Sequence, residues 1–304
     1  MQEEEYIEKI EQLNKRIIDL KKSKEFRTGR NFIIIKDMIR KIQFKKIIKK
    51  EVNKIKRRKW SFPEKENSFI DINKQDENRK VVVYTCVTGK YDNIIEPFIK
   101  QKNVDYIFFT DEPNVESDIW QVRQLPKNVE NIGDKILQNR YIKFHPYELF
   151  ENEYDYAIYV DGNIEIIGDM KKITFAADSL TGLALHRHRT RNSVFDEAKE
   201  CCIIHKGNPE KIKAQMKKYE KEGFLPKFGL YECCVIVSNL KSKNGKKILE
   251  DWWHEFLSSE SYRDQLSLPY VIWKDNFNFD DVGNLGYNVY QNPKFSFKEK
   301  IHNN

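Results

Sequence analysis

The sequence has few cysteines and lacks the long apolar runs that a membrane-spanning helix requires. Its 304 residues include five cysteines, an odd number without C-x-x-C spacing: Cys86, Cys201, Cys202, Cys233 and Cys234. This pattern argues against a disulfide framework or a zinc site, and it favours free thiols in a reducing cytoplasm. No run of about 18 apolar residues is present, which excludes a transmembrane helix. The opening residues, Met-Gln-Glu-Glu-Glu, do not resemble a secretory signal, so we expect a cytoplasmic protein.

Several well-known catalytic signatures are also missing. The chain contains no G-x-x-x-x-G-K-[ST] loop, no H-E-x-x-H helix and no Ser-His-Asp order. The loop after the first predicted strand has a single glycine, Gly89, where a dinucleotide-binding fold would have G-x-G-x-x-G. Any activity must therefore be carried by a different arrangement of polar side chains.

The positive charge of the chain is concentrated near its N-terminus. Residues 1–60 hold 20 of the 54 Lys and Arg residues but only 9 of the 47 Asp and Glu residues, so the remainder is mildly acidic. Residues 61–79 contain Pro63, few aliphatic residues and many polar ones, which is typical of a linker. We therefore expect a basic helical extension over residues 1–60, a linker over 61–79 and a main domain over 80–304.

An apolar stripe marks the first part of the extension. Five residues recur at alternating steps of four and three, namely Tyr6, Ile10, Leu13, Ile17 and Leu20. The pattern is a heptad stripe, although it covers fewer than three heptads. It is compatible with a homo-oligomer formed through residues 6–20, and equally with a helix that packs on its own domain.

The second part of the extension, residues 31–60, combines apolar and basic residues. Ile35, Met38 and Ile42 fall on one helical side, and Lys and Arg dominate the rest. A basic amphipathic helix is typical of a protein bound to an anionic membrane surface, so we expect a peripheral protein at the inner face of the cell membrane. A solvated helix covering the domain is the second interpretation. A nucleic-acid-binding arm ranks third, because an apolar stripe serves no purpose on a phosphate backbone.

The main domain alternates predicted strands and helices. The predicted strands cover residues 81–87, 104–110, 119–125, 156–160, 181–186 and 233–237, and the predicted helices cover 134–144, a segment from 194, 209–222, 246–257 and 263–273. Asp134 is the predicted N-cap of the first of these helices. This alternation predicts a three-layer α/β domain with a mixed central sheet.

The stretch around which the domain is organised is Tyr154–Ile167, in which a buried strand ends at Asp161. Open α/β sheets bind ligands at the carboxyl ends of their strands. Asp161 and Asn163 are two residues apart in an extended segment and point the same way. Two oxygen ligands at this spacing suit Mg²⁺ or Mn²⁺ held partly by substrate phosphates. The same Asp-Gly-Asn triplet is also ordinary turn chemistry between strands.

Six short motifs occur in a fixed order between about residues 81 and 275. They are Tyr84-Thr85…Gly89-x-Tyr91-Asp92, Phe109-Thr110-Asp111, Asn139-Arg140-x-x-Lys143, Tyr159-Val160-Asp161-Gly162-Asn163, Gly229-Leu230-x-Glu232-Cys233-Cys234 and Arg263-Asp264-Gln265-Leu266-Ser267-x-Pro269-Tyr270. Together they resemble the glycosyltransferase-like domain family of bacterial surface-polysaccharide loci and plant Golgi proteins (the TOD/MUCI type). That family is similar to GT-A glycosyltransferases, so the resemblance implies a Rossmann-like nucleotide-sugar domain.

The resemblance also implies a metal site of the D-x-D type. Asp161 and Asn163 occupy its two positions, and the second carries a neutral amide oxygen in place of a carboxylate. GT-A enzymes often add a histidine near the C-terminus, and His302 is the candidate here. The implied cofactor is Mn²⁺ or Mg²⁺, with a nucleoside diphosphate sugar as the donor.

The remaining roles follow residue by residue from the same resemblance. Tyr84, Thr85 and Asp111 fall where the nucleoside is held, Arg140 and Lys143 where diphosphate or sugar is contacted, and Glu232 and Asp264 where donor sugar and acceptor meet. Arg263 adds a further cation. His186, Arg189 and Glu197 match a less specific His…Arg…Glu-Ala pattern of the same family, which precedes a helix.

These residues predict a glycosyltransferase that uses a nucleoside diphosphate sugar, with a UDP-sugar favoured, and a surface-polysaccharide or glycolipid acceptor such as a growing capsule chain. Asp264 or Glu232 would position the acceptor hydroxyl, or deprotonate it if the enzyme inverts. One alternative is a nucleotide-sugar-binding module without transferase activity. A nucleic-acid-associated protein is disfavoured by the acidic main domain, and a scaffold protein is the remaining alternative.

Overall fold

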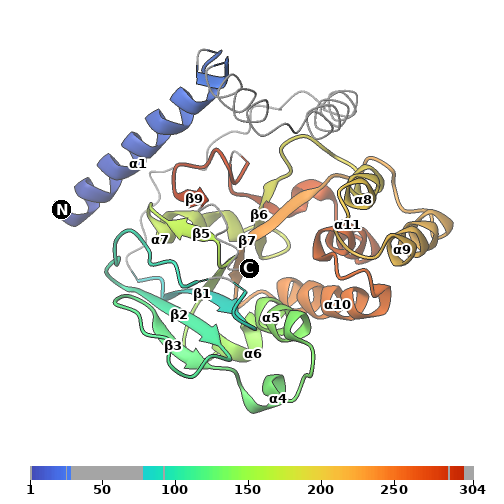
Figure 1. Cartoon of the computed structure of the whole chain (residues 1–304), viewed down its shortest axis with the longest axis horizontal. Coiled ribbons are helices and arrows are strands. Elements are labelled where there is room, and N and C mark those ends of the chain that lie inside the picture. The colour runs from blue at the N-terminus through green and yellow to red at the C-terminus, as the bar shows by residue number, and fades with distance from the viewer. Residues whose placement is uncertain (1, 25, 29–77, 92, 287, 298–304) are drawn as a thin grey trace, which may run out of the picture.

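The computed structural model describes residues 2–24, 26–28, 78–91, 93–286 and 288–297 (Figure 1). The predicted basic helix of residues 31–60, nearly all of the 61–79 linker and His302 lie outside these residues. The domain boundaries at 60 and 79 therefore stay predictions. Among the helices described, none is long and apolar enough to cross a membrane.

A seven-stranded mixed sheet forms the centre of the domain. Its strands are β1 (Val81–Val87), β2 (Val104–Thr110), β3 (Gln121–Gln124), β4 (Tyr156–Val160), β6 (Leu183–Arg187), β7 (Tyr231–Asn239) and β8 (Gly283–Asn284). The spatial order is β3-β2-β1-β4-β7-β6-β8. The strands from β3 to β4 run parallel, whereas β7 runs antiparallel to both β4 and β6. All residues of β1 and β4 are buried, because both faces of the sheet are covered.

Helices cover both faces of this sheet, as the alternation predicts (Figure 1). The helices of the domain are α4 (Lys127–Glu130), α5 (Lys135–Phe144), α6 (Pro146–Phe150), α7 (Met170–Ile173), α8 (Val194–Ile203), α9 (Pro209–Lys221), α10 (Lys243–Ser259) and α11 (Asp264–Lys274), with short 3-10 turns η1 (Thr174–Ala177) and η2 (Phe279–Asp281). One core packs α5, α6, α10 and α11 on the sheet through aromatic side chains such as Phe144 and Trp252. The other core holds Met170 and Ile173 of α7.

The predicted N-cap of α5 is confirmed. Asp134 accepts hydrogen bonds through its side chain from the backbone N–H groups of Ile136 and Leu137, at 2.7 and 3.1 Å. These bonds satisfy two of the donors that a helix leaves free at its first turn. The cap fixes where α5 begins, and with it the face on which Arg140 and Lys143 lie.

A second, two-stranded sheet continues from the Asp-Gly-Asn triplet. It pairs β5 (Ile164–Ile166) antiparallel with β9 (Phe295–Phe297). The backbone N–H of Ile164 donates to the carbonyl of Asp161 at 3.0 Å, so the triplet does form a tight turn. Thus β4 and β5 hold the triplet from both sides.

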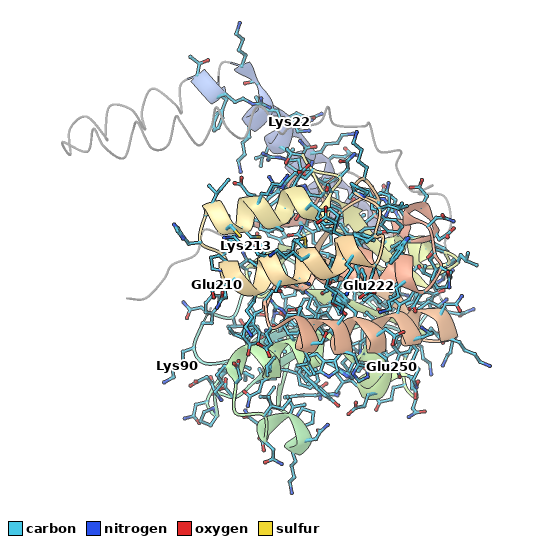
Figure 2. The ribbon with its side chains drawn as sticks, turned by 90° about the vertical axis from the view of Figure 1, so that its right-hand side faces the viewer. Lys22, Lys90, Glu210, Lys213, Glu222 and Glu250 are labelled. Carbon is cyan, nitrogen blue, oxygen red and sulfur yellow. The ribbon has the colours of Figure 1, made fainter. Side chains whose placement is uncertain are left out.

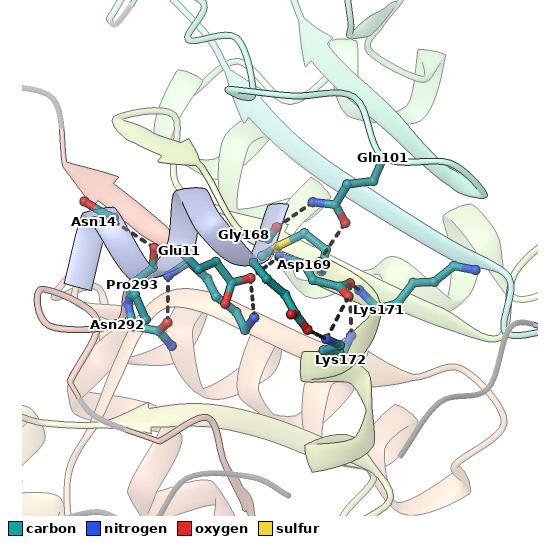
Figure 3. Close-up of polar contacts among 12 residues, drawn as sticks. Glu11, Asn14, Gln101, Gly168, Asp169, Lys171, Lys172, Asn292 and Pro293 are labelled. Atoms are coloured by element: carbon teal, nitrogen blue, oxygen red, sulfur yellow. Dashed lines mark hydrogen bonds and ion pairs between the residues drawn. The ribbon is translucent and has the colours of Figure 1, made fainter. Parts of the chain in front are cut away.

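The N-terminal helix α1 (Gln2–Lys22) packs on this small sheet (Figure 3). Glu11 accepts a hydrogen bond from the backbone N–H of Asp169 and an ion-pair contact from Lys294, each at 2.6 Å. Asn14 donates to the carbonyl of Pro293 at 2.7 Å. The helix therefore docks on its own domain, which is one of the two expected arrangements.

Three residues of the heptad stripe point away from the docked face of α1. Leu13, Ile17 and Leu20 keep 51%, 48% and 65% of their surface exposed, whereas the neighbouring Ile7 is buried. A homo-oligomer through residues 6–20 stays a prediction, and the exposed stripe leaves room for one. All five cysteines are free thiols, and Cys86, Cys201 and Cys233 among them are buried.

Candidate active site

Asp111, Asp161 and Glu232 lie at the end of the large sheet where β1, β2 and β4 finish and the antiparallel β7 begins. The backbone N–H of Asp161 donates to the carbonyl of Cys234 at 2.9 Å, which joins the end of β4 to β7. Glu232 lies two residues before Cys234, so it reaches the same edge. The antiparallel direction of β7 is what brings a residue from late in the sequence next to Asp161.

Gly162 lets the turn after Asp161 come close to β1. A β-carbon at this position would lie only 2.6 Å from Cγ2 of Val87. Valine is branched at Cβ and has little rotamer freedom to withdraw that methyl group. The absence of a side chain at residue 162 therefore allows Asp161 to sit directly over the end of β1.

Four charged side chains form a network that is here called the Lys143 cluster: Lys143, Arg140, Asp264 and Asp161. The ammonium of Lys143 is 2.6 Å from Oδ2 of Asp264 and 3.8 Å from Oδ1 of Asp161. Nε of Arg140 lies 3.3 Å from the same Asp264 oxygen. The Lys143 side chain is 1% exposed, so its positive charge is held inside the protein rather than in solvent. Arg140 and Lys143 of α5 therefore both point into the site.

The charges of the Lys143 cluster keep Asp264 ionised. Burial alone would raise the pKa of Asp264, but Lys143, Arg140 and Arg263 outweigh it and hold the pKa well below its usual range. Burial likewise favours a lower pKa for Lys143, and the charges of Asp264 and Asp161 raise it instead. Asp264 is therefore a poor proton acceptor, and its charge serves to hold two cations in place.

Asn139 anchors this helix face to the sheet. Its side-chain amide donates to the carbonyl of Cys86 in β1, and its oxygen accepts from Nη1 of Arg140, both at 2.5 Å. Asn139 thereby holds one end of the Arg140 guanidinium, and the Nε at the other end faces Asp264. A fixed guanidinium suits recognition of an anion, because little side-chain entropy remains to be lost on binding.

Asp111 lies at the ends of β1 and β2. It accepts from the backbone N–H of Gly89 at 2.9 Å and pairs with the ammonium of Lys135 at 2.7 Å. Burial favours a higher pKa for Asp111, but the bonds from Lys135 and Gly89 lower it. A carboxylate at this position is available to a sugar hydroxyl or to a base edge.

Tyr84 and Thr85 lie inside the protein, below this edge. The hydroxyl of Tyr84 donates to the backbone carbonyl of Lys143 at 3.1 Å, and both side chains are buried. Tyr84 therefore braces α5 against β1. Contact of either side chain with a nucleoside stays a prediction.

His186 is also an interior residue. It packs edge-on against Phe295, and its Nε2 lies 3.0 Å from the side-chain amide of Asn292. Burial lowers its pKa to about 3, so the ring stays neutral. Arg263 is more exposed than these residues, and its charge acts on both Cys201 and Asp264. The structure thus joins Arg263, but not His186, to the Lys143 cluster.

A second polar group, here called the Glu232 cluster, contains Glu232, His188, Arg191 and Glu197. Nε2 of His188 lies 3.6 Å from Oε1 of Glu232 and 3.8 Å from Oε2 of Glu197. Nε of Arg191 pairs with Glu197 at 2.6 Å. Burial, then the charge of Glu197, raises the pKa of Glu232 to about 7, although Arg189 and Arg191 oppose the shift. A carboxyl group with this pKa can release or take up a proton at neutral pH.

The sequence pattern points to Glu232 and Glu197, but not to His188 or Arg191 as their partners. The signal is the dense run of His and Arg residues from His186 to Arg191, which begins in the last two residues of β6 and continues into the following loop. Such a run reads equally as a solvated loop. Only the fold shows that His188 is turned inward between two carboxylates.

Asp161 and Asn163 carry oxygen atoms of the kind that Mg²⁺ and Mn²⁺ bind, and their role as metal ligands stays a prediction. In the ranges that the structure describes, no three His, Cys, Asp or Glu side chains are placed to hold an ion together. Asp161 and Asn163 offer two oxygen ligands, and Mg²⁺ commonly takes the others from phosphates and water. An ion held by these two residues would need its remaining ligands from a substrate such as a diphosphate and from water.

The family model described as TOD1/MUCI70, glycosyltransferase-like domain, matches residues 57–295. No curated protein matches. Among solved structures, the chain is similar to the bifunctional glycosyltransferase WbbM in its apo form, with 12% sequence identity and a TM-score of 0.43. That match covers 72% of this chain and 40% of the WbbM chain, so this chain spans less than half of its length.

Proposed function

The chain belongs to the TOD1/MUCI70 glycosyltransferase-like domain family, and from this premise we propose that it transfers a sugar from a nucleoside diphosphate sugar to a glycan or glycolipid acceptor. The observation that carries the proposal is the Lys143 cluster, in which two fixed cations lie beneath Asp161 at the carboxyl ends of parallel strands. This is where an α/β sheet places its ligand. A UDP-sugar is the favoured donor.

The donor would lie across the edge of the sheet from Asp111 to Arg140. Asp111, held by Gly89 and Lys135, faces the nucleoside. Arg140 and Lys143 offset the negative charge that develops on the diphosphate as it leaves. Because these cations are already held by Asp264, they need no rearrangement when the charge develops.

Asp161 and Asn163 are the residues that would hold Mg²⁺ or Mn²⁺ with the diphosphate. Such an ion, when bound, supplies Lewis-acid stabilisation of the leaving group. The neutral amide of Asn163 makes the protein's share of the ligands weaker than two carboxylates would. The dependence of donor binding and turnover on Mn²⁺ or Mg²⁺ should therefore be measured for this chain.

Glu232 is the residue that we assign to the proton of the acceptor. In an inverting transfer, the acceptor hydroxyl loses its proton to the Glu232 carboxylate while its oxygen bonds to the anomeric carbon. The bond from that carbon to the diphosphate oxygen breaks, and the nucleoside diphosphate leaves with the electron pair. Asp264 holds the cations and positions the donor, a role that agrees with its low pKa.

The experiment that tests this proposal is a thermal melt against UDP-, GDP-, CMP- and dTDP-sugars, with and without Mn²⁺, followed by a turnover assay for released nucleotide. A donor at about 100 times its dissociation constant adds about 2.7 kcal/mol to the free energy of unfolding. Stabilisation by one donor that Asp161→Ala removes supports the site. No stabilisation by any donor rejects it, and binding without turnover favours the alternative of a nucleotide-sugar-binding module.

The location of the protein at the membrane is a separate part of the proposal. Residues 31–60 would hold the protein on the anionic inner face of the cell membrane, next to a lipid-linked or capsule-type acceptor. Deleting residues 1–60 should release the protein from phosphatidylglycerol-containing vesicles and leave donor hydrolysis intact. A truncated protein that still sediments with the vesicles would show that these residues are not the anchor.

A further inference from the structure

His188 is held in one protonation state by the backbone. Its Nδ1 accepts hydrogen bonds from the N–H groups of Thr190 and Arg191, at 3.2 and 3.0 Å. A ring nitrogen that accepts two donors carries no proton, so the proton of the neutral ring lies on Nε2. The contact of Nε2 with Nη2 of Arg191, at 3.5 Å, is longer than both backbone bonds. His188 therefore presents a fixed N–H group toward Glu232 and Glu197.

Glu197 is held from the other side. Its carboxylate pairs with Nε of Arg191 at 2.6 Å, and the thiol of Cys201 donates to it at 3.6 Å. Both Glu197 and Glu232 are buried. Glu197 has a cation of its own, whereas Glu232 faces the neutral ring of His188 and the backbone N–H of Arg189. The negative charge of Glu197 therefore opposes ionisation of Glu232.

We propose that Glu197 and His188 are positioning residues that keep Glu232 able to accept and release the proton of an acceptor hydroxyl. Glu197 does so by its charge, and His188 by a fixed N–H that orients the Glu232 carboxylate. The inference rests on the proposed transferase function, and it assigns roles to two residues that act only through a third. In the ordinary surroundings of a paired carboxylate, Glu232 would have a lower pKa and would be a weaker base for the acceptor hydroxyl.

The charged groups that face Glu232 come from several elements. The loop after β6 supplies His188, Arg191 and the backbone N–H and guanidinium of Arg189, and α8 supplies Glu197. Tyr290 approaches from the segment before β9, and Cys233 and Cys234 are neighbours on β7 itself. The positive charges of Arg189 and Arg191 lower the pKa of Glu232. Burial and the negative charge of Glu197 raise it by more.

The test is a ¹³C NMR titration of the Glu232 carboxyl in the full chain, assigned by Glu232→Gln. In Glu197→Gln, which keeps the side-chain size, we expect the pKa of Glu232 to fall by about one pH unit or more. The acid limb of the pH profile of kcat/KM should move with it. The matched control is Glu210→Gln, which removes an exposed carboxylate in the first turn of α9 (Figure 2) and should move neither.

His188 is tested by two substitutions. Glutamine offers an amide N–H and an acceptor oxygen, so His188→Gln should keep most of kcat, whereas His188→Leu should lower kcat more than it changes KM. Equal losses in both variants would assign His188 a purely structural role and overturn its part of the proposal. The two His188 variants also test the proposal if Glu197→Gln does not fold.

The two levels of the proposal fail in different ways. A wild-type Glu232 that titrates at an ordinary value of about 4.3, or a titration that Glu197→Gln leaves unmoved, overturns the inference while donor turnover persists. Absence of turnover in the wild type, with the titration as expected, rejects the transferase function instead.

Discussion

The Lys143 and Glu232 clusters place two buried carboxyl groups at one edge of one sheet, in opposite surroundings. Asp264 has two cations in contact, Lys143 at 2.6 Å and Arg140 at 3.3 Å. Glu232 has a neutral histidine in contact and a second carboxylate beyond it. The pKa of Asp264 is held far down and that of Glu232 is raised to about 7. Burial is common to both, so the charge of the neighbours decides which group can carry a proton.

The largest expected effect on activity comes from removing the Glu232 carboxylate. Glu232→Gln should reduce transfer by a factor of about 10²–10⁴, the usual contribution of a general base, and leave the fold intact. The measurement is single-turnover nucleotide release from a bound donor, with donor affinity by titration calorimetry. Wild-type turnover in this variant would assign the proton to another group.

Removing Asp264 should instead affect the fold. Asp264→Ala leaves Lys143 buried without its nearest anion, and breaking one half of a buried pair typically costs about 3–5 kcal/mol. Urea unfolding followed by circular dichroism measures this loss. The matched variant is Glu232→Gln, which should change the free energy of unfolding much less at pH 7. Similar losses in both would mean that the two clusters do not differ as described.

The dependence of stability on pH should have opposite signs at the two carboxyl groups. The folded-state pKa of Glu232 lies above its unfolded value, so its contribution is present below about pH 4.3 and is lost as pH rises toward 7. The folded-state pKa of Asp264 is lowered, so its contribution is present above about pH 4 and is lost as pH falls further.

Glu232→Gln removes the contribution of Glu232 to the pH dependence of stability. The stability loss of the wild type between pH 5 and pH 7.5 should exceed that of the variant by at most about 3 kcal/mol. His186 and His188, whose pKa values burial lowers to about 3, act in the opposite direction and are present in both proteins. Identical pH dependence in the two proteins would show that Glu232 titrates normally.

The smallest expected effect concerns α1, which touches neither cluster. Glu11→Ala removes the acceptor of the Asp169 and Lys294 contacts and should cost about 1–2 kcal/mol. The NMR titration of Glu232 should be unchanged. A shifted titration would show that the docked helix influences the site through β5 and β9, and would join two regions that the comparison treats as separate.

The large elements of the fold could be predicted from the sequence, because their signals are local. The apolar runs of β1, β2 and β4 and the cap at Asp134 were enough to place four elements. The short strands β5, β8 and β9 were missed, since two or three residues carry no alternation. The edge strand β3 is shorter than predicted and β7 is longer.

The roles of the site residues were less accessible, because they depend on neighbours distant in sequence. Helical spacing put Arg140 and Lys143 on one face, but only the fold shows that the face is buried under Asp161. The sequence shows the His-Arg run at the end of β6, but only the fold distinguishes the interior His186 from His188, which faces Glu232. A register shift between Leu185 and His186 separates the end of β6 from its regular pairing, and no sequence pattern marks it.

The close approach of Gly162 to Val87 has a consequence for how this chain tolerates mutation. A side chain at residue 162 has no space unless the Val87 methyl group is removed. In a deep mutational scan, nearly every substitution of Gly162 should be depleted in the native background, and Gly162→Ala should be partly restored by Val87→Ala. The two positions would then show strong pairwise epistasis although 75 residues separate them in the sequence. A search for diverged members of the family should therefore score this pair jointly.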